Sequence, residues 1–200
     1  MYPTLPSGRL YRIVAESARA SKERNMDERK GVVTRGGKPV TLVGPEIKVG
    51  QKAPDFILVD KDWKEVKLSQ SNGKVRLLSV VHSLDTPVCD LQTQLFENEA
   101  GKFKDAVIYT ISMDLPFAQA RYCGAHNISN LKTLSDHKDA TFGTAYGVLI
   151  KEFRLHARAI FVIGGDGTVA YVEYVKEVGN APDYEKALAA LKKLTPGAKV

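Results

Sequence analysis

This sequence lacks apolar runs long enough to cross a membrane, and it contains little cysteine. Its longest apolar stretches fall short of the roughly 18 residues that a membrane helix needs, so we expect no membrane attachment. No apolar core of a secretory signal precedes the main part of the chain, which favours a cytoplasmic location. The two cysteines, Cys89 and Cys123, fit either buried thiols of a reduced cytosolic protein or one structural disulfide of a secreted protein.

Positive charge is unevenly distributed along the chain. A net charge of +6 raises the possibility of a nucleic-acid-binding protein. However, residues 1–25 hold five basic and two acidic side chains, which leaves a net charge of only +3 for residues 26–200. Basic and acidic residues are interspersed in that larger part, so it lacks the concentrated basic patch of a nucleic-acid-binding surface. We therefore expect no nucleic-acid partner.

Residues 1–30 differ from the rest of the chain. Apolar residues between Leu10 and Ala18 are spaced for one face of a short helix, but charged residues crowd its other side. The segment fits a disordered leader, a transit peptide, or a stretch upstream of a true start at Met26; Glu16 and Glu23 count against a transit peptide. We predict a mobile extension over residues 1–30 and one domain over residues 31–200, long enough to bury a substantial core.

Strand and helix patterns alternate along this domain. A β-hairpin is predicted over residues 32–43, around a turn at residues 35–38. Further strands are predicted over residues 56–59, 65–68, 75–81, 106–112, 131–134, 159–163 and 168–175. Helices are predicted after Cys89, with Leu91, Leu95 and Phe96 on the buried face, and over residues 115–123, 141–146 and 184–194. This order predicts an α/β protein with a mixed central sheet.

Cys89 lies where a strand pattern gives way to a helix pattern. The apolar run over residues 75–81 precedes it, and helical spacing follows. The first N–H groups of a helix have no partner within the helix, and the helix dipole favours negative charge there, so this position eases formation of a thiolate. Thr86, three residues earlier, can turn its hydroxyl toward the same sulfur. Cys89 is therefore a candidate nucleophile.

Cys123 lies 34 residues after Cys89, on the helix that follows the next strand. In such an order both helices can lie near the same end of the sheet, so the two sulfurs could come within disulfide reach after local rearrangement. Attack of a thiolate on a peroxide leaves a sulfenic acid, which a nearby thiol condenses to a disulfide. The two cysteines therefore suit a redox pair in which one thiol attacks and the other resolves.

The segment around Cys89 resembles the active-site loop of the peroxiredoxins. Thr86-x-x-Cys89, preceded by Asp85, is the shared motif, and the longer run Ser83-Leu84-Asp85-Thr86-Pro87-Val88-Cys89 is similar to the thiol peroxidase subfamily, the atypical two-cysteine type. Four other segments carry the same resemblance: Ala53-Pro54-Asp55-Phe56, the run over residues 112–123, Ala157-Arg158-Ala159 and Pro182-Asp183-Tyr184. Together these segments cover residues 31–194.

The resemblance implies a fold and a set of roles. The fold is thioredoxin-like, with a central mixed sheet flanked by helices and an added N-terminal β-hairpin, commonly as a homodimer. Cys89 is implied as the peroxidatic nucleophile toward hydrogen peroxide and organic hydroperoxides, with Thr86 hydrogen-bonding the thiolate and the peroxide oxygen. Arg158 is implied to lower the pKa of the thiol and to stabilise the leaving oxygen. Cys123 is implied as the resolving thiol, in an intramolecular disulfide that thioredoxin reduces.

One position departs from the family pattern. The family usually carries proline seven residues before the nucleophile, whereas this chain has His82 there. A histidine restores a backbone N–H donor, frees the backbone dihedral angle and brings a titratable ring near the sulfur. We expect the peroxidase chemistry to survive this change, with altered peroxide access or altered sensitivity to overoxidation.

Other interpretations of the same residues compete. His82 with Cys89, and Cys123 with His126, suggest a zinc site, but the spacings do not match tight ligand pairs. We expect neither a metal nor an organic cofactor, and we expect the remaining histidines to be ordinary surface residues. Taken alone, Arg158 also fits a salt-bridge partner on a surface strand.

A second function fits the same fold. The Cys89 and Cys123 pair suits a non-catalytic redox sensor that relays oxidation to a partner. Both functions need a reactive Cys89, but only the peroxidase needs turnover with a reductant. A thiol-disulfide oxidoreductase is disfavoured because the sequence contains no Cys-x-x-Cys.

Overall fold

The structure, a computed structural model, describes residues 27–196. The predicted extension over residues 1–30 lies almost entirely outside this range. The first described strand, β1 (Glu28–Arg35), begins within the last residues of that segment and forms an antiparallel hairpin with β2 (Lys38–Val43). Gly36 and Gly37 both have positive φ angles, 59° and 75°, as a two-residue hairpin turn between twisted strands requires. The predicted hairpin is confirmed.

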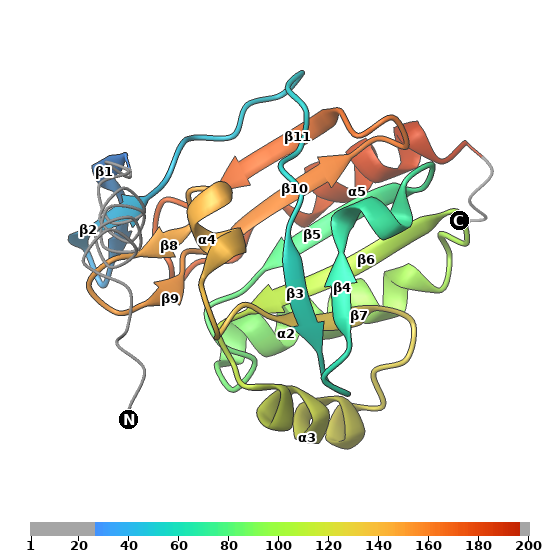
Figure 1. The fold of residues 1–200 in the computed structure, drawn as a ribbon, viewed down its shortest axis with the longest axis horizontal. Helices are drawn as coiled ribbons and strands as arrows, with labels where there is room; N and C mark the ends of the chain where they lie inside the picture. Colours follow the sequence, from blue (N-terminus) through green and yellow to red (C-terminus); the bar gives the residue numbers. More distant parts are fainter. Residues whose placement is uncertain (1–26, 197–200) are drawn as a thin grey trace, which may run out of the picture.

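A mixed seven-stranded sheet forms the centre of the molecule, with the strand order β11-β10-β5-β6-β7-β3-β4 (Figure 1). Its strands are β3 (Ile57–Asp60), β4 (Glu65–Lys67), β5 (Val75–Val80), β6 (Ala106–Ser112), β7 (Lys132–Ser135), β10 (Ala159–Ile163) and β11 (Val169–Tyr174). β5, β6 and β7 pair in parallel, whereas the remaining pairs are antiparallel. The predicted mixed sheet is confirmed, with element ends shifted by one or two residues.

Two short strands that the sequence does not reveal extend the hairpin into a second sheet. β8 (Leu149–Ile150) pairs with β2, and β9 (Leu155–His156) pairs with β8, which gives a four-stranded sheet of order β1-β2-β8-β9. Strands of two residues are too short to show an alternating pattern. The second sheet lies beside the central sheet and leads directly through residues 157–158 into β10 (Figure 1).

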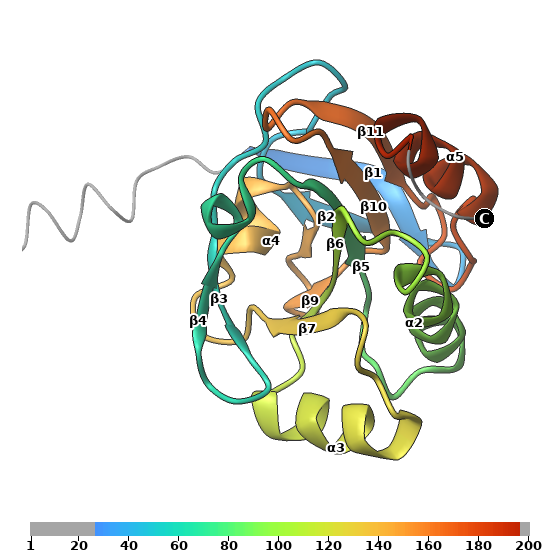
Figure 2. The ribbon, with the colours of Figure 1, turned by 90° about the vertical axis from the view of Figure 1, so that its right-hand side faces the viewer.

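Helices cover both faces of the central sheet (Figures 1 and 2). α2 (Pro87–Ala100) and α5 (Tyr184–Leu194) pack on one face. α4 (Thr141–Ala145) and the 3-10 helix η1 (Leu68–Ser71) contribute to the packing on the other. α3 (Pro116–His126) lies next to β7, which pairs with β6 on one side and β3 on the other. The sequence thus correctly predicts four helices, although α3 runs three residues further than expected.

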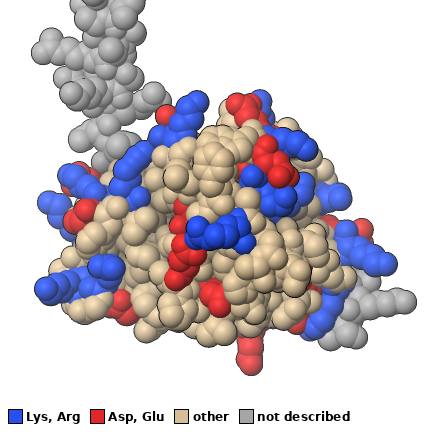
Figure 3. Space-filling view, turned by 90° about the horizontal axis from the view of Figure 1, so that it is seen from below, with Lys and Arg blue, Asp and Glu red and all other residues tan. Residues whose placement is uncertain are grey.

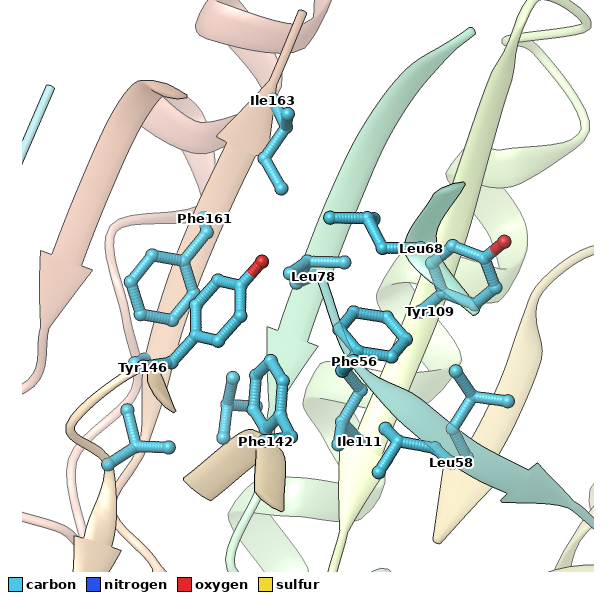
Figure 4. Close-up of a cluster of buried hydrophobic side chains, with 14 of the residues drawn as sticks. Phe56, Leu58, Leu68, Leu78, Tyr109, Ile111, Phe142, Tyr146, Phe161 and Ile163 are labelled. Carbon is cyan, nitrogen blue, oxygen red and sulfur yellow. The ribbon is translucent and has the colours of Figure 1, made fainter. Parts of the chain in front are cut away.

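The core is divided between the two faces of the sheet. Leu77 faces the cluster under α2 and α5, whereas its neighbour Leu78 faces the aromatic cluster on the other side. Figure 4 shows that second cluster, in which Phe56, Phe142 and Phe161 gather around Tyr146. β5, which is mostly apolar, therefore contributes side chains to two hydrophobic layers, as expected for a strand covered on both faces.

The buried face of α2 differs from the predicted face. Leu91 is 66% exposed, whereas Gln92 is fully buried, so the expectation that Leu91 lies in the core is wrong. The helix instead buries Cys89, Gln92, Thr93, Phe96 and Glu97. Polar side chains can be buried without a large cost when their hydrogen bonds are satisfied, and hydropathy alone does not reveal such partners.

Glu97 illustrates this, because its carboxylate holds the loop between α3 and β7. It accepts N–H groups of Ser129 at 2.9 Å, Asn130 at 2.8 Å and Leu131 at 3.0 Å. Burial alone raises the pKa of Glu97, but these hydrogen bonds outweigh it and leave the pKa lowered.

We expect Glu97→Ala to reduce the free energy of unfolding by about 3 kcal/mol, because three backbone N–H donors, of which that of Leu131 is buried, lose a charged acceptor. Glu97→Gln, which keeps an oxygen acceptor without the charge, is the matched control and loses less. Since the folded state lowers the pKa, the difference between wild type and Glu97→Ala shrinks as pH falls below the ordinary value of 4.5. Urea unfolding at several pH values measures both effects, and equal stabilities of wild type and Glu97→Ala at neutral pH contradict them.

Candidate active site

Cys89 is placed by the junction of β5 and α2. Thr86 has extended backbone angles, φ −106° and ψ 142°, and precedes the first helical residue, Pro87. Proline suits that position because the first N–H of a helix needs no partner within the helix. Cys89 is thus the third residue of α2, in the turn where the helix dipole favours an anion. Its side chain is fully buried and packs with Val81 and Tyr122.

Arg158 makes the direct polar contact to this sulfur. Its Nη2 donates to Cys89 Sγ at 3.3 Å, its Nη1 to Gln92 Oε1 at 2.7 Å and its Nε to the carbonyl oxygen of Val178 at 3.2 Å. The side chain is 2% exposed, so the alternative of a surface salt-bridge residue is wrong. A guanidinium whose three nitrogens have separate partners is held in a fixed orientation, with one N–H directed at Cys89 Sγ.

Gln92 orients the arginine and was missed by sequence reasoning. Its Nε2 donates to Ser79 Oγ at 2.8 Å, so its Oε1 is left to accept from Arg158. A spacing of three residues places Gln92 on the same helix face as Cys89. That spacing is visible in the sequence, but nothing in the hydropathy pattern indicates that a glutamine is buried there.

Thr86 has a different hydrogen-bond partner from the one expected. Its Oγ1 donates to the carbonyl oxygen of Ser83 at 2.9 Å rather than to Cys89. The hydroxyl proton is therefore engaged within the loop, and the lone pairs of the oxygen stay available to accept a hydrogen bond. Thr86 still lies beside the cysteine, at the cavity described below.

Asp114, also missed, anchors the loop that leads into α2. Its carboxylate accepts Ser83 Oγ–H and the Leu84 N–H, both at 2.8 Å, and Ser112 Oγ–H at 2.8 Å. The loop between β6 and α3 thereby holds the loop between β5 and α2. Both loops follow parallel strands that end at the same edge of the sheet, and this juxtaposition cannot be read from residue spacing.

A cavity of about 480 Å³ opens beside Cys89. Its walls are Arg35, Gly36, His82, Thr86, Pro87, Val88, Arg158, Glu177, Val178 and Gly179. Cys89 itself is not among them, so a substrate in the cavity meets Thr86 and Arg158 before it reaches the sulfur. The N-terminal hairpin forms one wall through its turn.

Glu177 fixes that hairpin turn. Its carboxylate accepts the N–H groups of Gly36 and Gly37 at 3.0 Å and the hydroxyl of Thr34 at 2.8 Å. These hydrogen bonds lower the pKa of Glu177 to about 2, so the carboxylate stays ionised in ordinary buffers. These hydrogen bonds hold the turn of the added hairpin against the cavity wall.

Cys123 is buried on α3 and faces away from the cavity wall toward β7. Its Sγ lies 3.4 Å from Thr133 Oγ1, and both cysteines are free thiols in this structure. Burial raises the pKa of the Cys123 thiol. Tyr122, the preceding residue, donates its hydroxyl to Asp90 Oδ1 at 2.7 Å and so holds α3 against α2. The structure thus brings Cys89, Thr86 and Arg158 together, but it does not bring Cys123 into contact with them.

The histidines do not all lie on the surface. His156 is fully buried with its Nε2 3.0 Å from Asp136 Oδ2, so the expectation of a surface residue is wrong there. His82 is 8% exposed, and its Nδ1 lies 3.1 Å from the carbonyl oxygen of His156. Burial lowers the pKa of His82, and the positive charges of Arg35 and Arg158 act in the same direction. Within residues 27–196, no three His, Cys, Asp or Glu side chains gather as a metal site.

Among the described helices, none has the length and apolar character to span a bilayer. On the face seen from below in Figure 3, Lys and Arg are interspersed with Asp and Glu, and neutral residues lie between them.

Comparison with known proteins agrees with this geometry. Residues 48–188 match the Redoxin family. A thiol peroxidase of Bacillus subtilis (strain 168) is 54% identical over 162 residues, which cover 81% of this chain and 97% of that protein. A thiol peroxidase of Halalkalibacterium halodurans is 54% identical over 160 residues, which cover 80% of this chain and 96% of that protein.

Solved structures agree on the fold. A peroxiredoxin-like protein from Aquifex aeolicus superposes with a TM-score of 0.77 at 40% identity, covering 84% of this chain and 98% of its own. A thiol peroxidase from Chromobacterium violaceum, at 22% identity, has a TM-score of 0.73 and covers 80% of this chain and 95% of its own. The predicted thioredoxin-like fold is confirmed. The chain belongs to the Redoxin family and, within it, to the thiol peroxidases, which are peroxidases of the peroxiredoxin type.

Proposed function

We propose that this peroxidase reduces hydrogen peroxide and organic hydroperoxides by nucleophilic attack of Cys89. The contact that carries this proposal is the 3.3 Å hydrogen bond from Arg158 to Cys89 Sγ. It gives the third residue of α2 a buried positive partner in addition to the helix dipole, and both favour the thiolate that attacks. Oxygen transfer to this sulfur yields a sulfenic acid and an alcohol, or water when the substrate is hydrogen peroxide.

Thr86 and Arg158 take separate roles toward the peroxide in this proposal. The lone pairs of Thr86 Oγ1 accept the hydroperoxide O–H, because the hydroxyl proton is already donated to Ser83. Arg158 stabilises the negative charge that develops on the leaving oxygen, since a fixed donor in a buried site needs no reorganisation during the reaction. Both side chains line the cavity that leads to the sulfur.

Cys123 resolves the sulfenic acid in an intramolecular disulfide, which thioredoxin then reduces. The free Cys123 thiol is buried against Thr133, so resolution requires that α3 loosen from α2 and β7. The rearrangement is local, because Tyr122 next to Cys123 already packs in the cluster around Cys89. A cytoplasmic location fits this cycle, since a reducing compartment returns both cysteines to thiols. We also propose that the protein forms a homodimer, on the basis of the family resemblance alone.

Mass spectrometry after one equivalent of peroxide tests the cysteine roles. We expect the protein to lose two hydrogens, with peptide mapping that links Cys89 to Cys123. A sulfenic or sulfinic acid on Cys89 with Cys123 still free contradicts the role of Cys123. Cys89→Ser is the control and stays unmodified at Cys123.

A coupled assay separates the peroxidase from the redox sensor. With thioredoxin, its reductase and NADPH, the peroxidase consumes NADPH continuously when peroxide is added. Oxidation of Cys89 without sustained NADPH consumption favours the sensor instead. A different dithiol reductant in the same assay shows whether the failure lies in thioredoxin alone.

A further inference from the structure

His82 lies in the wall of the cavity beside Cys89 and has no role in the chemistry described so far. It follows β5 directly and shares the cavity with Thr86 and Arg158. Its ring is therefore placed where a bound hydroperoxide meets the residues around the sulfur. The family resemblance implies proline at this position, so histidine adds a titratable group there.

The hydrogen bond at Nδ1 determines which nitrogen of His82 carries the proton. The carbonyl oxygen of His156, 3.1 Å away, can only accept, so Nδ1 is the donor. In the neutral ring Nε2 then carries a lone pair. Nε2 has no hydrogen-bond partner among residues 27–196. It is also not among the fully buried side-chain nitrogen and oxygen atoms that lack a partner, so it is accessible. It is thus an open base on a residue that lines the cavity.

The residue that accepts this hydrogen bond is itself held by the core. His156 is fully buried, and its Nε2 contacts Asp136 Oδ2 at 3.0 Å. Asp136 in turn accepts the N–H groups of Phe142 at 3.2 Å and Gly143 at 2.8 Å at the start of α4. A Cβ on Gly143 would lie 2.8 Å from His156 Nε2, so glycine permits this close approach. His156 is therefore a positioning residue for His82.

The charged groups around His82 keep its ring neutral. Arg35 approaches from the hairpin and Arg158 from the segment before β10, and both disfavour a second proton on the ring. Asp114, from the loop after β6, and the carbonyl oxygen of His156 act in the opposite direction. Burial is the largest influence and leaves the pKa of His82 below its ordinary value, so the ring is an acceptor at neutral pH.

We propose that His82 is a further catalytic residue of this peroxidase, which carries the hydroperoxide proton from the attacked oxygen to the leaving oxygen. This inference rests on the proposed attack by Cys89. The sulfur of the thiolate forms a bond to the terminal oxygen, the O–O bond breaks, and the leaving oxygen departs with the electron pair. Thr86 Oγ1 accepts the O–H when the hydroperoxide binds; as the sulfur attacks, this O–H turns to Nε2, which takes its proton and delivers it to the leaving oxygen.

This step balances without any other reactant. Thiolate and hydroperoxide become sulfenate and alcohol, the sulfur loses two electrons, and the peroxide gains two. The imidazole ends as it began, neutral with its proton on Nδ1. A proton relay of this kind matters most when the leaving oxygen is strongly basic, and it matters least when the leaving group is stable as an anion.

Two oxidants that differ in their leaving group test the relay. The leaving alkoxide of tert-butyl hydroperoxide needs a proton, whereas the acetate released by peracetic acid does not. The decisive variant is His82→Asn, because its amide N–H can still donate to the His156 carbonyl while the base at Nε2 is lost. Oxidation of Cys89 is followed in a single turnover by rapid quenching and mass spectrometry, without any reductant.

We expect His82→Asn to slow oxidation by tert-butyl hydroperoxide about 100-fold and oxidation by peracetic acid by less than about threefold. His137→Asn, a histidine outside the cavity lining, is the matched control and changes neither rate. Equal losses with both oxidants mean that His82 only shapes the loop, and they overturn the relay, as does an unchanged rate with tert-butyl hydroperoxide.

A measurement on the wild type keeps the proposal testable if the variant does not fold. If His82 transfers the proton in the transition state, the reaction with tert-butyl hydroperoxide is slower in deuterium oxide than in water, whereas the reaction with peracetic acid is not. The same small isotope effect with both oxidants overturns the relay. Failure of the proposed function gives a different result from failure of the relay. If neither oxidant oxidises Cys89 in the wild type, the proposed attack by Cys89 is itself wrong.

Discussion

Cys123→Ser is expected to slow turnover with thioredoxin more than about 100-fold, because an outside thiol must replace a tethered one. The oxidation of Cys89 by the first equivalent of peroxide keeps its wild-type rate, since Cys123 has no contact with the cavity that leads to the sulfur. The variant therefore separates the oxidation of Cys89 from the resolution of its sulfenic acid.

The structure gives a reason to expect an intact fold in this variant. Serine fits the space of the thiol, and its hydroxyl can keep the contact with Thr133 that the sulfur makes at 3.4 Å. Tyr122 and Asp90, which hold α3 against α2 through a 2.7 Å hydrogen bond, are untouched. The loss thus reports the missing thiol rather than a displaced helix.

The coupled NADPH assay measures turnover, and rapid quenching with mass spectrometry measures the first oxidation. In Cys123→Ser, excess peroxide should drive Cys89 on to sulfinic acid, because no thiol intercepts the sulfenic acid. Thr133→Val is a useful companion, since it removes the hydroxyl that contacts Cys123 and leaves both cysteines in place. Turnover of Cys123→Ser close to that of wild type contradicts the resolving role.

The large elements of the fold could be predicted because each has its own periodic signal. β5 and β6 are continuous apolar runs, and α5 has an apolar stripe that begins at a capping aspartate, Asp183, which accepts the N–H of Lys186. The short strands β8 and β9 have no such signal. They exist because the hairpin offers β2 as a pairing edge, and that is a tertiary property.

The candidate site could be predicted only where a motif was present. Thr86 and Arg158 line one cavity, and Arg158 contacts Cys89, although Thr86 hydrogen-bonds Ser83 rather than the sulfur. The residues that hold the site, such as Gln92, Asp114 and Glu177, went unnoticed. Each is a polar side chain whose role depends on donors from a distant segment, and a single sequence does not show which donors will meet it.

Arg158→Met is expected to slow the first oxidation of Cys89 by about 100- to 1000-fold, the usual effect of losing one preorganised donor at a developing charge. Methionine fills much of the same buried volume but offers neither charge nor N–H groups. Gln92 Oε1 and the carbonyl oxygen of Val178 lose their donors at the same time. Thermal unfolding therefore accompanies the kinetics, so that a loss of folded protein is not mistaken for a slower reaction.

Arg158→Lys separates charge from geometry at the same position. Arginine reaches Val178, Gln92 and Cys89 through three different nitrogens, whereas lysine has one nitrogen and cannot keep this fork. We expect the lysine variant to recover about tenfold of the methionine loss, because a positive charge still favours the thiolate. For Arg158→Met, a rate of Cys89 oxidation within about threefold of wild type contradicts a role for Arg158 in the reaction.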